Sequence, residues 1–235
     1  MGMQMSQLVL SLFPGIGLLD MAFEEEGFTV VRGPDVLWGG DVRRFHPPEG
    51  RFDGVIGGPP CQLFSATQYV APQRHAENLI PEYERVVAEA QPAWFVMENV
   101  KGAPLPVVEG YAVRDTLLNN RWVAEAPEQN RVRRFSFGSL ADLDPWALLE
   151  LALFENPVKE YAVVGGHGSM NDHRQAKSGY GSTDVRKMSR LQGLPEDYLD
   201  GTPFTVHGKR LVLGNGVPLP MGRAIARAVK KAVGE

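Results

Sequence analysis

The only cysteine of this 235-residue sequence, Cys61, lies in a turn-forming stretch that could expose its thiol. The stretch reads Gly-Gly-Pro-Pro-Cys-Gln at residues 57–62 and follows the apolar run Gly-Val-Ile. Paired glycines and prolines after a strand predict a rigid turn that presents a side chain at a sheet edge. A free cysteine is more often a small buried apolar group, but such a group needs no turn of this kind. Where a cation or helix end lowers its pKa, a thiolate is a nucleophile, so Cys61 is a candidate for covalent chemistry.

Two charged stretches could complete such a site. Glu98 follows the apolar run Ala-Trp-Phe-Val-Met, which predicts a carboxyl group at the same sheet edge as Cys61. It could act as an acid if its surroundings raised its pKa, although a Glu at a strand end is commonly solvated. In Gln-Asn-Arg-Val-Arg-Arg at 129–134, strand alternation predicts Arg131 and Arg133 on one face. Two cations on one face suit an anionic or carbonyl-rich ligand.

A glycine turn and two aspartates indicate a small-molecule site. The turn Phe-Pro-Gly-Ile-Gly at 13–17 stands between a predicted strand and helix, where backbone amides can approach a ligand. It lacks the third glycine of the dinucleotide fingerprint and the Gly-Lys-Ser/Thr of a phosphate loop, which disfavours nicotinamide cofactors and nucleoside triphosphates. Asp35 could hold ribose hydroxyls and Asp41 could accept from an adenine amino group, although both can be plain turn residues. A nucleoside without charged phosphates fits this set.

Alternating elements would position these groups. Apolar runs predict strands and amphipathic spacing predicts helices, with strands at 7–13, 28–32, 53–58 and 93–97 and helices at 18–27 and 77–90. Residues 113–120 continue the series as helical and 121–126 as β-rich. This order predicts an α/β fold with a mostly parallel sheet that binds ligands at the carboxyl ends of its strands. Later segments predict helices at 143–154, 184–195 and 218–233, a strand at 161–166 and a polar, glycine-rich loop at 165–184.

Charge and composition bound the partners. The net charge of −4 argues against a protein that coats nucleic acid nonspecifically. Residues 1–120 carry 8 Lys or Arg and 15 Asp or Glu, whereas residues 121–235 carry 16 and 13. A polyanion should therefore meet the second half. One cysteine allows no internal disulfide, and no apolar run of about 20 residues or secretory signal occurs, so we expect a cytoplasmic protein without a membrane contact.

Seven motifs together resemble the cytosine-C5 DNA methyltransferases. They are SLFPGIGLLDMAFEEEGF, GDV, GGPPCQLFS, ENV, QNRVR, RLQGLPEDY and GNGVPLP, in the order and approximate spacing of that family. The resemblance covers about residues 8–139 and 184–233, and GGPPCQ followed by ENV and Q-x-R-x-R is its most specific part. It implies a Rossmann-like S-adenosylmethionine-dependent fold with a small recognition subdomain. The corresponding division is a catalytic and cofactor-binding domain at 1–139, a target-recognition region at 140–183 and a C-terminal segment at 184–235, whose closing helix returns to the catalytic domain.

The resemblance also implies a mechanism and its residues. Cys61 would add to carbon 6 of a cytosine flipped out of duplex DNA, protonated Glu98 would meet N3, and Arg133 with Arg131 would hold the base carbonyl and buttress the pocket. S-adenosylmethionine would give its methyl group to carbon 5 and leave as S-adenosylhomocysteine, with no metal required. The implied cofactor contacts are Phe13, Gly15, Ile16, Gly17, Asp35, Asp41, Val42, Pro60 and Asn215. The implied DNA contacts are Gln62, Ser65, Arg174 and Lys177.

Departures from the family pattern limit the match. Pro14 and Leu18 replace a small residue and a glycine in the turn, and the short interval between Asp35 and Asp41 predicts loss of a helix, which weakens the assignment of Asp35. Trp38 is a candidate for stacking on adenine. The recognition region, residues 140–183, is short, which predicts a short or relaxed target sequence. Its polar candidates also include His167, Ser169, Asn171 and His173.

The sequence alone leaves several functions open. We expect a monomer acting on duplex DNA in a bacterial or virus-infected bacterial cell, with a cognate restriction nuclease as one fitting partner. Alternatives are a tRNA or free-nucleotide cytosine methyltransferase of the same fold, an enzyme with an altered cofactor, and a catalytically silent DNA-binding relative. Intact Cys61, Glu98, Arg131 and Arg133 argue against the silent relative. A single cysteine disfavours the two-cysteine RNA enzymes.

Overall fold

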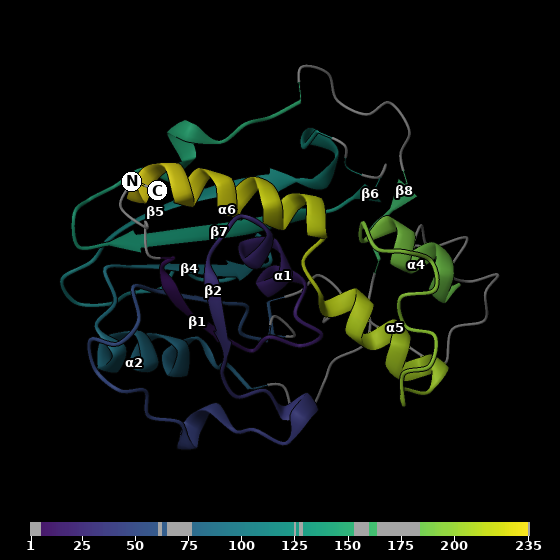
Figure 1. The fold of residues 1–235 in the computed structure, drawn as a ribbon, viewed down its shortest axis with the longest axis horizontal. Coiled ribbons are helices and arrows are strands. Elements are labelled where there is room, and N and C mark those ends of the chain that lie inside the picture. Colours follow the sequence, from purple (N-terminus) through teal and green to yellow (C-terminus); the bar gives the residue numbers. More distant parts are fainter. Residues whose placement is uncertain are drawn as a thin grey trace.

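A twisted six-stranded sheet forms the centre of the molecule (Figure 1). The computed structural model describes residues 6–60, 63–64, 77–124, 126, 129–152, 160–163 and 184–234. The strand order is β2-β1-β3-β4-β7-β5; the first four strands are parallel, and β7 is antiparallel to both β4 and β5. The strands are β1 Leu8–Leu12, β2 Thr29–Arg32, β3 Gly54–Gly57, β4 Trp94–Asn99, β5 Ala112–Asn119 and β7 Val132–Ser139. The expected α/β fold with a mostly parallel sheet is confirmed.

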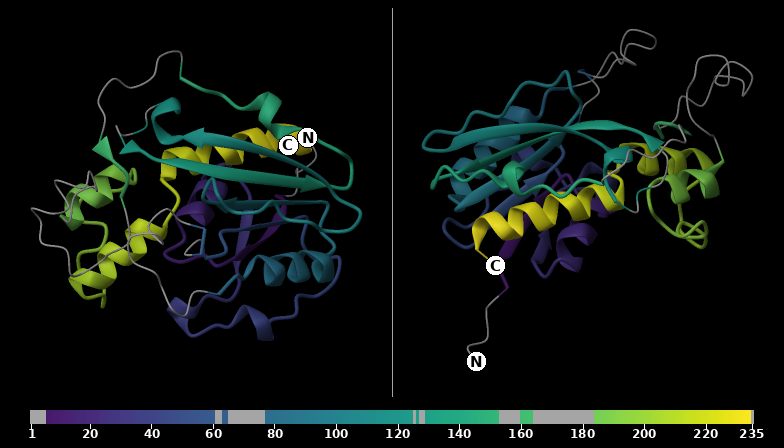
Figure 2. Two further views of the ribbon diagram at one scale, coloured as in Figure 1. Left: turned by 180° about the vertical axis from the view of Figure 1, so that it is seen from behind. Right: turned by 90° about the horizontal axis from the view of Figure 1, so that it is seen from above.

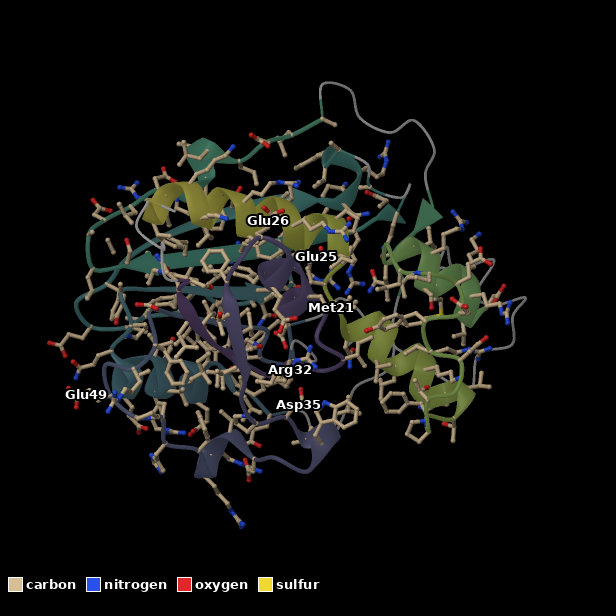
Figure 3. The ribbon with its side chains drawn as sticks, viewed as in Figure 1. Met21, Glu25, Glu26, Arg32, Asp35 and Glu49 are labelled. Atoms are coloured by element: carbon tan, nitrogen blue, oxygen red, sulfur yellow. The ribbon has the colours of Figure 1, made fainter. Side chains whose placement is uncertain are left out.

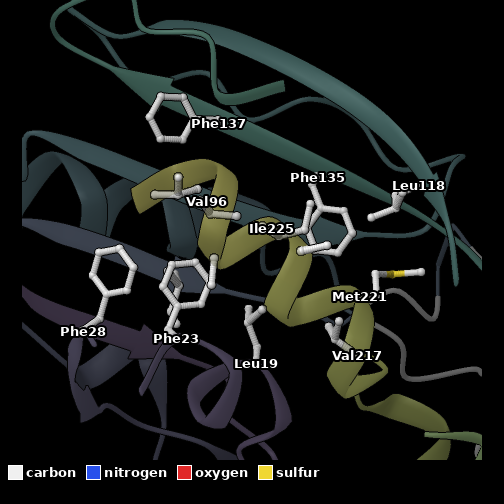
Figure 4. Close-up of a cluster of buried hydrophobic side chains, with 14 of the residues drawn as sticks. Leu19, Phe23, Phe28, Val96, Leu118, Phe135, Phe137, Val217, Met221 and Ile225 are labelled. Atoms are coloured by element: carbon white, nitrogen blue, oxygen red, sulfur yellow. The ribbon is translucent and has the colours of Figure 1, made fainter. Parts of the chain in front are cut away.

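Helices cover both faces of this sheet (Figure 2). Helices α1 (Leu18–Glu25) and α6 (Leu219–Val233) pack on one face, and α2 (Ile80–Ala90) packs on the other. Strand alternation sends one set of side chains to each face, so in β4 Trp94 and Val96 face α1 and α6 while Phe95 and Met97 face α2. Figure 4 shows the buried apolar cluster between the sheet and helices α1 and α6, which includes Phe23, Phe135 and Ile225. The helices predicted at 18–27, 77–90 and 218–233 are confirmed as α1, α2 and α6.

A smaller unit lies beyond the carboxyl ends of the parallel strands (Figure 1). It contains α4 (Val185–Leu191), α5 (Val206–Asn215) and a two-stranded parallel sheet of β6 (Gln129–Asn130) and β8 (Glu160–Tyr161). Its apolar residues, among them Met188, Leu191 and Leu213, pack on Leu18 and Ala22 of α1. This cluster attaches the C-terminal segment to the end of the sheet where ligands are expected.

The connection from β2 to β3 contains two short 3-10 helices in place of an α-helix. They are η1 (Val36–Trp38) and η2 (Val42–Arg44), and the carboxylates of Asp35 and Asp41 cap them by accepting from the amides of Leu37 and Arg43. The expected loss of a helix between these strands is confirmed, and β2 is one of the two edge strands of the sheet.

Residues 113–120 form a strand, and the prediction of a helix there was wrong. They belong to β5, which pairs with β7 from Ala112 to Asn119. The β-branched residues Val113 and Thr116 favour a pleated surface, and pairing along the whole strand outweighs the local helical spacing. The predicted β-rich run at 121–126 was also wrong, because the chain turns there through the 3-10 helix η4 (Asn120–Trp122).

Residues 143–154 do not form the predicted helix within their described part. Only the 3-10 helix η5 (Pro145–Leu148) is present, capped by the carboxylate of Asp144. Tertiary contacts hold this segment in a non-helical path. The Trp146 ring packs against Phe137, and the amide of Ala152 donates to the carbonyl of Trp122 at 2.8 Å. The predicted strand at 161–166 is represented by β8, Glu160–Tyr161, and residues 164–166 lie outside the described ranges. Among the helices of the described residues, none is long and apolar enough to cross a bilayer.

Candidate active site

The ends of four strands bring the predicted catalytic stretches to one edge of the sheet. Strands β1, β3 and β4 end there, and antiparallel β7 begins there, since Asn99 pairs with Arg134. This edge, called the carboxyl edge below, gathers the glycine turn at 13–17, the loop that begins at Gly57 and the Glu98-Asn99 pair. The arrangement follows from strand direction and matches the expected position of ligand sites in parallel sheets.

Glu98 and Arg133 form a mostly buried ion pair at the carboxyl edge. Arg133 Nε lies 2.9 Å from Glu98 Oε1, and their side chains are 17% and 10% exposed. Glu98 pairs in register with Phe135, so Arg133, two residues earlier, lies on the same face of the sheet. Burial raises the pKa of Glu98 above its ordinary value of 4.5, and the charges of Arg133 and Arg131 offset part of that effect. The surroundings therefore favour a protonated carboxyl more than water does.

The loop before Cys61 lies close to Glu98 and is bonded to Asn99. A Cβ added to Gly58 would lie 3.0 Å from Glu98 Oε2, so a larger residue at this position would crowd the carboxyl group. Asn99 Nδ2 donates to the carbonyl of Pro59 at 3.1 Å, and Asn99 is 1% exposed. Glu98 and Asn99 point to opposite faces, and one supplies the carboxyl group while the other anchors the loop. Cys61 itself, next after Pro60, lies outside the described residues.

Sequence reasoning singled out Glu98 and missed the anchoring role of Asn99. The only signal was an Asn at the end of an apolar run, and a buried Asn needs a hydrogen-bond partner. Its partner could not be found from the sequence, because Pro59 lies 40 positions away.

Arg131 does not share a strand with Arg133. The strand breaks between them, because β6 ends at Asn130 and β7 begins at Val132. Arg131 is 1% exposed, and its guanidinium donates to the carbonyls of Val163, Gly214 and Gly216 at 2.5, 2.9 and 3.0 Å. The predicted shared face of Arg131 and Arg133 is therefore wrong: the strand partner changes between β6 and β7, and Arg131 turns toward the C-terminal segment.

The glycine turn is built around Gly15, which bonds on both sides to the β2–β3 connection. Its amide donates to Asp35 Oδ2 at 2.8 Å, and its carbonyl accepts from Trp38 Nε1 at 2.8 Å. Gly15 has a φ of +57°, and among the residues that the structure describes no non-adjacent atom lies within 4 Å of the point where its Cβ would stand. Phe13 also has a positive φ, 55°, and its amide donates to the carbonyl of Pro34 at 3.3 Å. The structure thus brings Asp35, whose assignment was weak, directly to the turn.

Gly17 ends the turn and begins α1. It has a φ of +80°, and a Cβ there would lie 2.7 Å from Arg32 Nη2. Arg32, at the end of β2, pairs with buried Asp20 of α1 at 3.0 Å. In the view of Figure 3, the labels of Arg32 and Asp35 both lie below α1. Ile16, between the two glycines, packs on the cluster shared with α4 and α5.

The carboxylate of Asp41 accepts hydrogen bonds from the neighbouring side chain of Arg43. Arg43 lies 2.9 Å away through Nε and 3.0 Å away through Nη2, and the hydrogen bond from this side chain lowers the pKa of Asp41. The lowered pKa favours the ionised carboxylate, and an adenine amino group would share it with Arg43. Val42, the next residue, is buried under the sheet.

Asn215 lies next to Gly216, which packs against Leu18 at the glycine turn. Asn215 is the last residue of α5, and a Cβ added to Gly216 would lie 2.7 Å from Leu18 Cδ1. The unusual Leu18 of the turn therefore packs directly on the Gly-Asn-Gly stretch. The predicted DNA contacts Gln62, Ser65, Arg174 and Lys177 lie outside the described residues.

Comparisons with known proteins agree with this geometry. The family model for the C-5 cytosine-specific DNA methylase matches residues 39–106, which include the loop of Cys61 and the Glu98-Asn99 pair. The match supports a member of the cytosine-C5 DNA methyltransferase family. It is 25% identical to the type II methyltransferase M.NgoPII of Neisseria gonorrhoeae over 96% of each chain, and 35% identical to M.AquIA of a Picosynechococcus species over 42% of this chain and 50% of that one. The family model and these relatives support the activity of a DNA (cytosine-5-)-methyltransferase, and the matched family and the fold imply use of S-adenosylmethionine.

Solved structures show the same methyltransferase fold. The Dnmt2 methyltransferase of S. pombe superposes with a TM-score of 0.64 at 14% identity, covering 98% of this chain and all of that one. The Entamoeba histolytica methyltransferase EhMeth gives 0.66 at 10% identity, over 99% and 100%.

This methyltransferase is compact relative to its relatives. Its alignment with M.NgoPII spans 329 positions, more than its own 235 residues, so the relative has many positions without a counterpart. The chain spans only 32% of the length of another relative, M.FnuDI of Fusobacterium nucleatum, at 34% identity.

Proposed function

We propose that this methyltransferase modifies carbon 5 of a flipped cytosine in double-stranded DNA through a covalent adduct with Cys61. The observation that carries the proposal is the buried Glu98, which pairs with Arg133 and lies against the loop that leads to Cys61. A cytosine placed between the loop and this pair would have a nucleophile and an acid within reach.

The chemistry explains why these groups are needed together. Carbon 5 of cytosine is a poor nucleophile, so a thiolate must first add to carbon 6 and push electrons toward N3. A protonated Glu98 can supply the proton that N3 gains, and the carboxylate left behind is stabilised by the guanidinium of Arg133. The raised pKa of Glu98 supports the first half of this exchange, and the 2.9 Å ion pair supports the second. Bound S-adenosylmethionine would supply the methyl group to carbon 5, after which loss of the carbon-5 proton to a base releases the thiolate.

The glycine turn offers a fitting place for the cofactor. Gly15 leaves open space where a side chain would stand, and Asp35 beside it presents carboxylate oxygens that suit ribose hydroxyls. Trp38, 62% exposed, offers an apolar ring next to the same turn. The remaining predicted contacts, which stay proposals, are Phe13, Ile16, Gly17, Asp41, Val42, Pro60 and Asn215.

A methyl-transfer assay tests the proposal. Purified protein incubated with labelled S-adenosylmethionine should transfer label to cytosine in duplex DNA, and Cys61→Ala should abolish transfer. Label on tRNA or on free deoxycytidine nucleotides, but not on DNA, would contradict the proposal and favour the alternatives of the same fold.

We further propose a short or relaxed target sequence. The gap-rich alignment with M.NgoPII supports a reduced recognition region, because few residues are available between β7 and α4 to contact bases. Conversion sequencing of a plasmid methylated in vitro should show modification at many related sites. A single long recognition sequence would overturn this part. A cognate nuclease, a monomeric state and a bacterial cytoplasmic setting fit the relatives that are type II methyltransferases.

A further inference from the structure

We infer that Gln129, Arg131 and Gln192 act together as a positioning group that joins the cofactor segment to the recognition region. This group, called the carbonyl clamp below, holds the main chain at Gly214–Gly216 and at Val163. The inference rests on the proposed function, since it assigns roles in placing the cofactor and DNA.

Arg131 is the charged centre of the clamp. Its Nη1 donates to the carbonyl of Val163, and its Nη2 donates to the carbonyls of Gly214 and Gly216 on either side of Asn215. The side chain is 1% exposed, so each of these charge-assisted bonds replaces water that the guanidinium has lost. A buried guanidinium leaves its partners only at a high free-energy cost.

Two buried glutamines complete the clamp. Gln129 Oε1 accepts from the amide of Val163 at 2.9 Å, and its Nε2 donates to Gln192 Oε1 at 3.1 Å and to the carbonyl of Leu191 at 2.7 Å. Gln192 Nε2 then donates to the carbonyl of Gly216 at 2.9 Å and to that of Leu213. Both glutamines are 0% exposed.

The clamp thus fixes two segments with different proposed tasks. Both the amide and the carbonyl of Val163 are held, and the chain continues from Val163 into residues 164–183, where the sequence predicts DNA contacts. Both carbonyls beside Asn215 are held as well, and Gly216 packs on Leu18 at the glycine turn. A change that loosens the clamp should therefore weaken cofactor and DNA binding together, although Gln192 is a predicted contact of neither.

This geometry separates Arg131 from Arg133. Arg133 lies against Glu98, where the base is proposed to bind, whereas the guanidinium of Arg131 donates to the main-chain carbonyls of Val163, Gly214 and Gly216. We therefore assign Arg131 as a positioning residue that acts through the backbone it holds.

The test compares binding with chemistry in two variants of the full chain. Gln192→Met keeps the volume but removes the clamp's amide, and Arg131→Lys keeps the charge but cannot span three carbonyls. We expect each to raise the dissociation constants of both S-adenosylhomocysteine and a cytosine-containing duplex about tenfold. The single-turnover methylation rate at saturating S-adenosylmethionine and duplex should stay within about threefold of the wild-type rate, because the reacting groups are untouched.

A matched control removes buried hydrogen bonds elsewhere. The hydroxyl of Tyr83, on α2, donates to the carbonyls of Val96 and Val55 at 2.8 and 3.3 Å on the opposite side of the sheet. Tyr83→Phe should lower the melting temperature without changing either dissociation constant, which separates positioning from general stability.

Two results would overturn the inference. One is Gln192→Met with both dissociation constants as in the wild type; the other is Arg131→Lys with unchanged binding and a single-turnover rate reduced tenfold or more, which indicates contact with the base. Failure of the wild-type protein to bind the duplex or to methylate it would instead contradict the proposed function.

Discussion

Two arginines of one short motif serve two different regions of this methyltransferase. At the carboxyl edge, Arg133 faces an ionisable partner, Glu98, and keeps 17% of its side chain exposed. In the carbonyl clamp, Arg131 is 1% exposed and faces neutral main-chain carbonyls. A partner that can change its protonation state suits catalysis, whereas fixed dipoles suit the permanent holding of a segment. The difference shows that similar side chains two positions apart are distinguished by their acceptors.

The largest expected effect is at the acid of the carboxyl edge. Glu98→Gln keeps the shape and can still donate a hydrogen bond to N3, but it cannot transfer a proton. We expect kcat to fall about 10²–10³-fold, measured by transfer of labelled methyl groups to duplex DNA. Binding of S-adenosylhomocysteine should stay unchanged, and a kcat within threefold of the wild-type value would remove Glu98 from the chemistry.

Arg133→Lys sharpens the comparison with Arg131→Lys. At position 133 the substitution keeps a charge near Glu98 but loses the planar guanidinium, so we expect kcat to fall about 10²-fold. The same substitution at position 131 should act on the dissociation constants. Steady-state kinetics together with calorimetric binding would separate the two, and identical profiles at both positions would abolish the distinction.

Asn99→Ala tests the anchor of the loop before Cys61. It removes the hydrogen bond to the carbonyl of Pro59 and leaves that carbonyl without this donor. We expect a loss of about 1–3 kcal/mol in the free energy of unfolding, measured by urea denaturation. Asn119→Ala, which removes an amide at the end of β5 that donates to Asn130 Oδ1, is a control; equal loss of kcat in both variants would contradict a specific role for the anchor.

The smallest expected effect is the pH dependence of stability. Burial raises the pKa of Glu98, so the folded state binds a proton more tightly than the unfolded state. Its contribution to stability is therefore fully present below the unfolded pKa, near the ordinary 4.5, and is lost as pH rises through the folded pKa. Melting temperatures of the wild type and Glu98→Gln should differ more with rising pH, in favour of the variant. A constant difference would exclude a raised pKa.

Much of the sheet and its ligand edge could be predicted from the sequence. Strands β1, β3 and β4 are short apolar runs ended by turn residues, and the direction of these strands alone brings the glycine turn and Glu98 to one edge. The β5 strand could not be predicted, because its conformation depends on pairing with β7, a partner that comes later in the chain.

Long-range contacts also determine the parts of the site that the sequence did not predict. The alternating pattern of residues 129–134 holds only within one strand, and the change of partner at Arg131 depends on β8 and on the distant Gly214–Gly216 stretch. A role for Gln192 could not be predicted from the sequence. Its side-chain amide bonds to Gln129, Leu213 and Gly216, which are distant in sequence and meet it only in the folded chain.

Trapping of the covalent adduct tests the central claim most directly. A duplex with 5-fluorocytosine at a methylation site retains fluorine where the carbon-5 proton would leave, so the adduct cannot be released after methyl transfer. Mass spectrometry of the digested complex should show the methylated nucleotide bound to the peptide that contains Cys61, and Glu98→Gln should slow its formation. Methyl transfer to ordinary duplex DNA without any adduct at Cys61 would contradict the account.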